Sequence, residues 1–161
     1  MLKELWAKTS AREKLIVYGA GLVAIGVIVG LILGTKEACA SFGGQTICSG
    51  ISVNYFTADN AGLFALLALV GAIVTLGVVY IHLAPNASIT LPAPYVQVLV
   101  VVAGVTAACA ILIVLMQLIR AGGFGPEPPI FMYVADIAAV AGGALLGYAA
   151  YMEYTANKPV A

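Results

Sequence analysis

Charged residues are scarce in this chain of 161 residues, of which Lys, Arg, Asp and Glu together make up 9%. A soluble domain usually carries about 25% charged residues, because its surface must stay hydrated. The seven basic and seven acidic residues also cancel, which leaves no excess of positive charge to neutralise a run of phosphates. The composition therefore excludes an ordinary soluble globule and argues against nucleic acid as a partner.

Side chains suited to catalysis or metal binding are equally few. His82 is the only histidine, and no base lies at a matching depth to activate a Ser, Thr or Cys nucleophile. A lone histidine at the end of an apolar run is usually a polar end residue, and membrane-bound haem usually needs two facing histidines. We therefore expect no enzyme activity, no catalytic residue, no metal and no cofactor.

Proline is absent from the four longest apolar runs, which cover residues 15–33, 62–83, 96–119 and 130–151. Each run is long enough to cross a bilayer, which takes about 20 residues. The runs are continuous rather than alternating, and backbone exposed to lipid must satisfy its own hydrogen bonds, so helices are favoured over strands. The sequence predicts an all-α integral membrane protein, an antiparallel bundle of four transmembrane helices forming one domain over residues 1–161.

Positive charge concentrates before the first run, at Lys3, Lys8, Arg12 and Lys14. Cytoplasmic segments of membrane proteins are enriched in Lys and Arg, so we expect both termini of this multi-pass cell-membrane protein in the cytoplasm. One observation opposes this orientation, because residues 84–95 would also be cytoplasmic yet contain no Lys or Arg.

The predicted orientation divides the rest of the chain into a cytoplasmic juxtamembrane segment (1–14), an outer loop (35–60) and a cytoplasmic tail (152–161). Ser10 and Glu13 in the first of these stand at capping-box spacing. This spacing predicts that the first helix begins before the apolar run does.

Two of the three cysteines, Cys39 and Cys48, share the outer loop with Gly43 and Gly44 between them. Thiols on the oxidising side of a membrane, joined by a glycine-containing turn, favour a disulfide. Closing a loop of about ten residues would restrict the unfolded loop by roughly 2.5–3 kcal/mol. Apolar residues between Ile47 and Phe56 partly alternate with polar ones, which indicates a short strand or hairpin in the same loop.

Four spans with a cysteine pair in the first outer loop resemble the claudin-like tetraspan layout in topology. This loop is much shorter and lacks the tryptophans that accompany that cysteine pair, so the sequence indicates no family.

Small residues recur along the helices in a pattern that allows close helix approach. Gly26, Gly30 and Gly34 lie four residues apart in and after the first run. The last run carries a matching stripe made of Ala135, Ala139, Gly143 and Gly147. Such ridges pack helices of one bundle together, or they form an interface between subunits.

Asp136 is the only carboxylate within a long apolar run. Its insertion at that depth costs roughly 2.5 kcal/mol or more, which a partner must offset. In an antiparallel bundle Gln117 and Arg120 reach a similar depth, and Tyr133 lies one turn away. We predict a polar cluster of these four residues. A proton or cation site and a pair with another subunit are the alternatives.

These features together favour a non-catalytic integral membrane subunit, an accessory or assembly component of a larger membrane complex or of a homo-oligomer. Its partners would be the lipid bilayer and other membrane subunits or copies of itself, without nucleic acid. The alternative is a small channel or a proton- or ion-conducting component that uses Asp136. An enzyme acting on lipid or quinone would need polar groups clustered at a membrane interface, and the sequence displays no such cluster.

Overall fold

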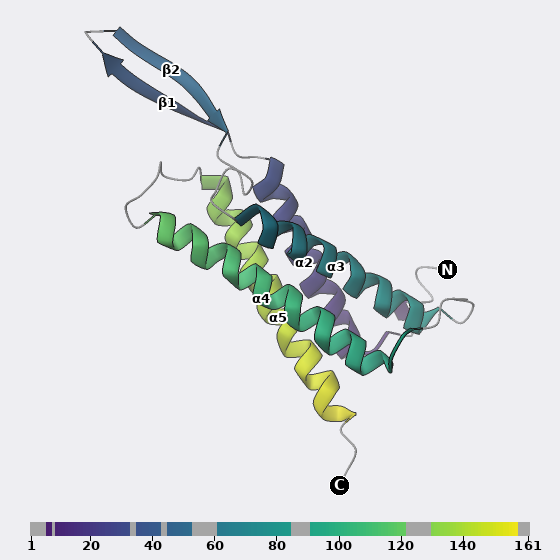
Figure 1. Ribbon diagram of the computed structural model, residues 1–161. Coiled ribbons are helices and arrows are strands. Elements are labelled where there is room, and N and C mark those ends of the chain that lie inside the picture. The colour runs from purple at the N-terminus through teal and green to yellow at the C-terminus, as the bar shows by residue number, and fades with distance from the viewer. Residues whose placement is uncertain are drawn as a thin grey trace.

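Long helices and one β-hairpin make up the described part of the computed structural model (Figure 1). The elements are α2 (Ala11–Ile32), β1 (Thr35–Phe42), β2 (Gln45–Ser52), α3 (Ala61–Leu83), α4 (Tyr95–Ala121) and α5 (Ile130–Ala156). The structure describes residues 6–7, 9–32, 35–42, 45–52, 61–84, 91–121 and 130–157. For the strands other than Gln45, and for residues 61, 117, 120 and 121, it describes the backbone alone.

Four of the helices are long and apolar enough to cross a membrane, which confirms the predicted multi-pass helical bundle. Their bounds differ from the apolar runs at the ends. Helix α2 begins at Ala11 instead of residue 15, and α5 continues to Ala156, into the predicted tail. A helix continues through polar residues as long as its backbone hydrogen bonds continue, whereas an apolar run ends at the first polar cluster.

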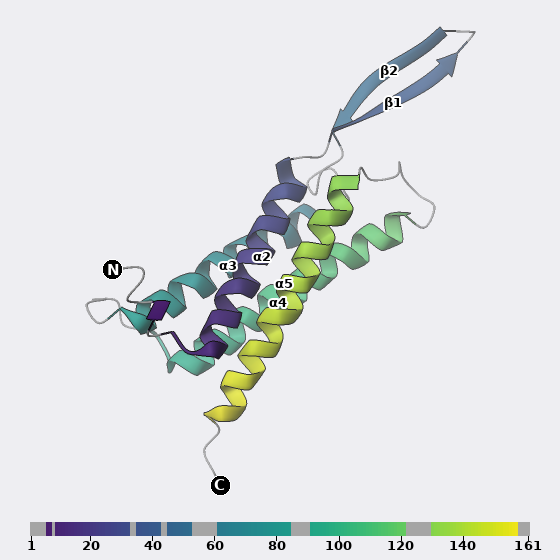
Figure 2. The ribbon, with the colours of Figure 1, turned by 180° about the vertical axis from the view of Figure 1, so that it is seen from behind.

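The four helices are packed antiparallel in a closed ring (Figures 1 and 2). Helix α2 packs against α5 and α3, and α4 packs against α3 and α5. The beginning of α2 and the end of α5 therefore lie at one end of the bundle, which we call the terminal end. The strands lie beyond the opposite end, which we call the hairpin end.

Glycines bring the backbones of α2 and α5 into direct contact. A Cβ atom added to Gly19 would lie 2.8 Å from the backbone nitrogen of Leu146, and one added to Gly142 would lie 2.7 Å from the carbonyl oxygen of Gly19. Two turns further along α2, a Cβ on Gly26 would lie 2.7 Å from the carbonyl oxygen of Ala135. Any side chain at these positions would push the two helices apart.

The predicted stripe of small residues on α5 divides between two neighbours. Ala135 and Ala139 lie against Gly26 of α2, whereas Gly143 and Gly147 face α4. A Cβ on Gly143 would lie 3.1 Å from that of Ala110, and one on Gly147 would lie 3.6 Å from that of Ala107. Gly30 is buried, and Gly34 lies outside the described residues.

The interior between the two ends is apolar. Two buried threonines, Thr75 and Thr106, are the polar side chains described there, and each donates to a carbonyl oxygen of its own helix, at 2.8 Å and 2.7 Å. Thr106 also fits against Gly71 of α3, where an added Cβ would overlap its hydroxyl. No polar path is visible across this part of the described bundle.

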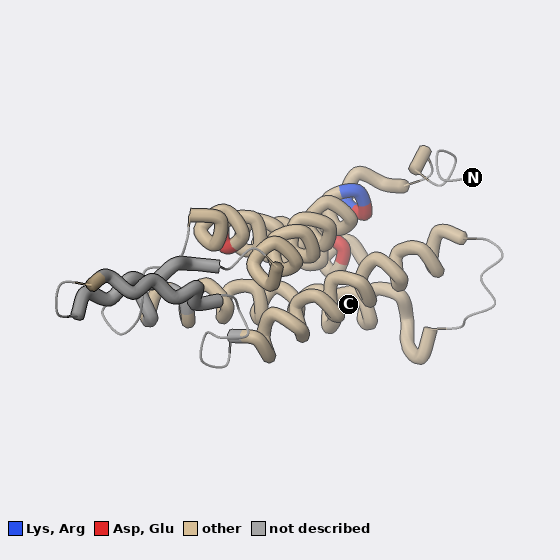
Figure 3. Tube along the Cα trace, turned by 90° about the horizontal axis from the view of Figure 1, so that it is seen from above, with Lys and Arg blue, Asp and Glu red and all other residues tan. Residues whose placement is uncertain are grey.

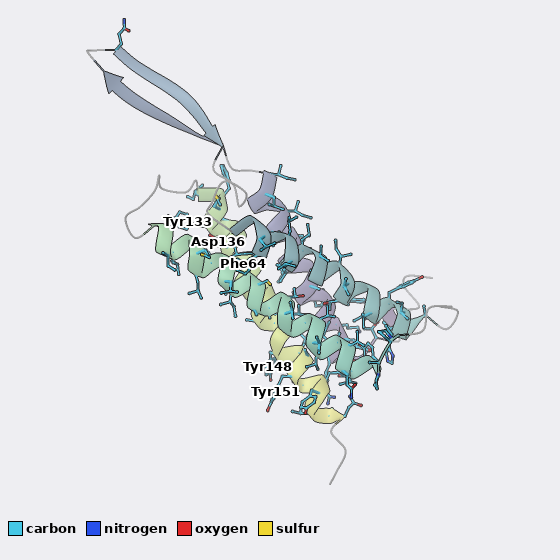
Figure 4. The ribbon with its side chains drawn as sticks, viewed as in Figure 1. Phe64, Tyr133, Asp136, Tyr148 and Tyr151 are labelled. Carbon is cyan, nitrogen blue, oxygen red and sulfur yellow. The ribbon has the colours of Figure 1, made fainter. Side chains whose placement is uncertain are left out.

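The outer surface of the bundle is equally apolar. Figure 3 shows how few charged residues the described helices contain. Large side chains such as Leu63, Ile73 and Ile137 are 57–70% exposed, which suits contact with lipid tails. Exposed tyrosines gather toward the terminal end, where Tyr148 and Tyr151 lie (Figure 4). Aromatic side chains are enriched at the interface between membrane and water.

The outer loop adds a β element to the predicted all-α fold. Strands β1 and β2 pair antiparallel over residues 35–42 and 45–52, and their contacts are chiefly with each other. The alternation between residues 47 and 56 therefore indicated only the second half of the hairpin, and residues 53–56 lie outside the described part. The hairpin projects away from the helix ends in both views (Figures 1 and 2).

Candidate functional site

A capping box fixes the start of α2 at the terminal end. The backbone nitrogen of Ser10 donates to Oε2 of Glu13 at 2.8 Å, and the backbone nitrogen of Glu13 donates to Oγ of Ser10 at 3.2 Å. This pair confirms the spacing read from the sequence and satisfies two backbone donors of the first turn. It also holds the Glu13 carboxylate in place, facing the bundle.

Glu13 connects α2 to α3 and, through His82, to α4. Its side chain is only 9% exposed, and its Oε1 lies 3.8 Å from Nε2 of His82, which forms an ion pair with it when protonated. The imidazole of His82 stacks on the ring of Tyr95, with centroids 3.8 Å apart and planes inclined by 10°. A histidine expected to be a solitary end residue therefore lies between a buried carboxylate and an aromatic ring.

Helix α5 joins the same group through Glu153. Its Oε2 lies 3.8 Å from a guanidinium nitrogen of Arg12, and its side chain is 16% exposed. Asn157 donates to the backbone oxygen of Glu153 at 2.9 Å and to its carboxylate at 3.3 Å. We call Arg12, Glu13, His82, Tyr95 and Glu153 the terminal cluster; its members come from all four helices of the ring.

The hydroxyl of Tyr95 is the unusual atom of the terminal cluster. It is buried and has no hydrogen-bond partner among the described residues. The carboxylates of Glu13 and Glu153 are close enough to interact with it electrostatically. A buried hydroxyl without a hydrogen-bond partner costs about 1–3 kcal/mol, so this atom destabilises the terminal end slightly.

The chemistry of the terminal cluster suits holding helix ends together. Its charged groups pair mainly with one another, and each partly exposed ion pair contributes only about 0–1 kcal/mol. Within the described residues, no three His, Cys, Asp or Glu side chains are grouped so that they could hold a metal ion. The cluster escaped the sequence analysis because its members are far apart in the chain. Aligning the helix ends that share one side of the bundle would have found it.

Asp136 lies at the hairpin end, in the second turn of α5 (Figure 4). It is 7% exposed and is engaged in an interaction, as expected for a carboxylate at this depth. Its predicted neighbour Tyr133 is 46% exposed. The side chains of Gln117 and Arg120 lie outside the described part of α4, so the predicted polar cluster stays a prediction.

The hairpin places Cys39 directly opposite Cys48 in the strand register. Both side chains lie outside the described part of the chain, and Cys109 is the free, buried cysteine that the structure describes. The predicted disulfide is therefore not part of the described structure. Directly opposed residues of an antiparallel pair have Cβ atoms about 4.5–5.5 Å apart, close to the spacing that a disulfide requires.

Comparison with known proteins gives no relative from which to infer a role: no family model, no curated protein and no solved structure matches this chain.

Proposed function

We propose that the protein is a non-catalytic integral membrane subunit, an accessory or assembly component of a larger membrane complex or of a homo-oligomer. The observation that supports this most is the hairpin of β1 and β2. It extends beyond the helices and is in contact chiefly with itself. A two-stranded hairpin alone is marginally stable in water, and its unpaired edges invite another chain. A partner that binds the hairpin would supply the missing contacts.

The packing of the bundle supports a role in assembly over conduction. Helices α2 and α5 touch through their backbones at Gly19 and Gly142, which leaves no space between them. Thr75 and Thr106, the buried polar groups in the middle, are satisfied by their own helices. A conducting path through one molecule would need polar groups or water at this level.

The terminal cluster supports the same role, because its charged groups are used in mutual contacts. Glu13 is held by its capping box and by His82, and Glu153 by Arg12 and Asn157. An enzyme acting at the membrane interface would need such groups free to reach a substrate. Polar groups that are scattered in the sequence thus meet at the terminal end of the fold. Their contacts with one another favour a role in holding the helix ends together.

The proposal includes the orientation and the disulfide expected from the sequence. Both termini lie in the cytoplasm, and the hairpin with Cys39 and Cys48 faces the oxidising side. The direct pairing of these two residues in the strand register favours the bond. A disulfide across the hairpin would hold its register in the absence of a third strand.

Excising the hairpin tests the proposed function. Deletion of residues 35–52 leaves residues 33–34 and 53–60 to connect α2 to α3, which are neighbours in the ring. We expect wild-type protein extracted from its native membrane in a mild detergent to run as a defined assembly. The deleted form should run as a smaller particle with the same melting temperature of its helices. Assemblies of equal size and composition would overturn the role of the hairpin.

Conduction through Asp136 is the second candidate, favoured only by the burial of this carboxylate. Proton flux into liposomes separates the two functions. We expect no flux above that of empty liposomes for either the wild type or Asp136→Asn. A flux that disappears in the variant would make conduction the function instead.

A further inference from the structure

An apolar groove of about 310 Å³ opens on the bundle surface at the terminal end, between α3 and the beginning of α2 with the residues that precede it. Leu76, Val79, Tyr80 and Leu83 form its α3 side, and Trp6 and Val17 lie among the residues opposite. Leu76 and Leu83 are two turns apart, so the groove runs roughly 10 Å along the helix from its end toward the middle of the bundle. Its size is at the lower limit of small-molecule pockets.

The groove lies at the end of the bundle, beside exposed aromatic rings. Trp6 is 39% exposed and Tyr80 is 56% exposed, so the opening faces the surroundings of the bundle. Trp6 also packs edge-on against Tyr18, with ring centroids 5.6 Å apart. Aromatic rings of this kind mark the level of the lipid headgroups, and the deeper wall at Leu76 lies at the level of the acyl chains.

A positive charge stands beside this opening. Nζ of Lys14 lies 5.5 Å from the ring centroid of Trp6. Lys14 precedes Val17 by three residues on α2, so both share the face that borders the groove. Arg12, by contrast, is paired with Glu153 of α5. Among the residues that the structure describes, Lys14 is therefore the cation available to a ligand in the groove.

We propose that this groove binds one acyl chain of an anionic phospholipid, whose headgroup is held by Lys14. The apolar lining suits a hydrocarbon chain, the ammonium group suits a phosphate, and the aromatic rings place the junction between them at the interface. A zwitterionic lipid would fill the same groove without the net attraction to Lys14. The site goes beyond the proposed function and does not depend on it.

Trp6 makes the test direct, because it is the only tryptophan of the chain and lines the groove. The protein is reconstituted in phosphatidylcholine. Phosphatidylglycerol with brominated chains is then added in increasing fractions, because bromine quenches the fluorescence of a nearby tryptophan. Brominated phosphatidylcholine serves as the comparison. One lysine near an anionic headgroup should make the anionic lipid effective at about fivefold lower mole fraction. If the two brominated lipids reach half-maximal quenching at the same mole fraction, the proposal is overturned.

Three variants separate the headgroup from the chain. Lys14→Gln should remove the difference between the two lipids within that variant, and a difference that persists would exclude Lys14. Leu76→Phe should fill the groove and weaken quenching by both lipids. Ile73→Phe is the matched control, since Ile73 is 57% exposed on α3 and does not line the groove. Equal quenching in the two phenylalanine variants would exclude the groove as the binding site of the chain.

A soluble anion is tested in the same samples. Addition of glycerol phosphate should leave the quenching by brominated phosphatidylglycerol unchanged, because the acyl chain supplies much of the affinity. Displacement of the lipid by millimolar glycerol phosphate would mean that the site takes a free anion, and would overturn the assignment to a lipid.

Discussion

At the scale of single residues, the distance between α2 and α5 depends on Gly19, Gly26 and Gly142. Lipid tails are as apolar as leucine, so membrane helices gain little from hiding apolar side chains and depend on close packing instead. The added Cβ atoms would lie 2.7–2.8 Å from backbone atoms of the facing helix. Backbone cannot rotate away as a side chain can, so even alanine at these positions must move a whole helix.

We predict that Gly19→Ala destabilises the bundle whereas Gly21→Ala does not. A Cβ on Gly19 meets the backbone of α5, but a Cβ on Gly21, two residues along the same helix, has nothing within 4 Å. Overpacking of this kind costs about 1–3 kcal/mol. Thermal unfolding of both variants in one detergent provides the measurement. Identical melting temperatures would mean that α2 and α5 do not touch at Gly19.

A second prediction separates the two roles of Glu13. Glu13→Gln keeps an acceptor for the backbone nitrogen of Ser10 but loses the charge that faces His82, whereas Glu13→Ala loses both. Loss of a capping interaction costs about 1 kcal/mol, and a partly exposed ion pair less. The alanine variant should therefore melt clearly below the glutamine variant, which should stay near the wild type. A glutamine variant as unstable as the alanine variant would show that the charge matters more than the cap.

At the scale of elements, the buried positions of α2 and α5 repeat every three and four residues in alternation. This series is Glu13, Ile16, Ala20, Val23, Val27 and Gly30 in α2, and Met132, Asp136, Ala139, Gly143, Leu146 and Ala150 in α5. The other buried residues of these helices lie beside it and repeat every seven residues: Gly19 and Gly26 in α2, and Ala135, Gly142 and Ala149 in α5. A spacing of 3.5 residues keeps one seam facing the partner when two helices wind around each other with a left-handed twist.

This spacing explains which packing glycines could be predicted from the sequence and which could not. A ridge drawn at steps of four includes Gly26 and Gly30 but passes over Gly19, which is seven residues before Gly26. The corresponding ridge on α5 includes Gly143 but omits its neighbour Gly142. The two residues face different helices, since Gly143 lies against α4 and Gly142 against α2. The apolar runs located every helix of the bundle, because length and hydropathy suffice for that. Which side of a helix meets which neighbour depends on the ring order, which apolar runs do not encode.

A third prediction concerns the hairpin. Mass spectrometry of a non-reduced digest should recover the peptides of Cys39 and Cys48 linked to each other, because the two residues are paired in the register. Cys39→Ser should release a thiol at Cys48 that reacts with soluble reagents, while Cys109 stays buried in the bundle. Two free thiols in protein taken from its native membrane would exclude the bond.

At the scale of the whole molecule, the antiparallel ring gathers residues that the sequence separates widely. Residues 13, 82, 95 and 153 meet at the terminal end because each lies at the end of its helix on that side. His82 was expected to be a solitary end residue because its neighbours in the sequence, Ile81 and Leu83, are apolar. Asp136 was recognisable from sequence because its signal is local, a carboxylate inside an apolar run.

The fourth prediction is the orientation of the molecule. In a background without the three native cysteines, single cysteines are placed at Ser88 and at Gly123 and treated with a membrane-impermeant thiol reagent. With both termini in the cytoplasm, the cysteine at position 123 should label in intact cells and the one at position 88 only after permeabilisation. The reverse pattern would invert the molecule and place the hairpin in the cytoplasm.

The length of the hairpin has a consequence for the kind of partner it can reach. Each strand has eight residues, and an antiparallel strand rises about 3.4 Å per residue, so the tip stands roughly 25 Å beyond the bases of the strands. The headgroup layer on one side of a bilayer is only about 5–8 Å thick. Even a hairpin tilted by 60° would therefore carry its tip past the headgroups into water. The partner that we propose for the hairpin can therefore be a water-soluble domain that does not itself enter the membrane.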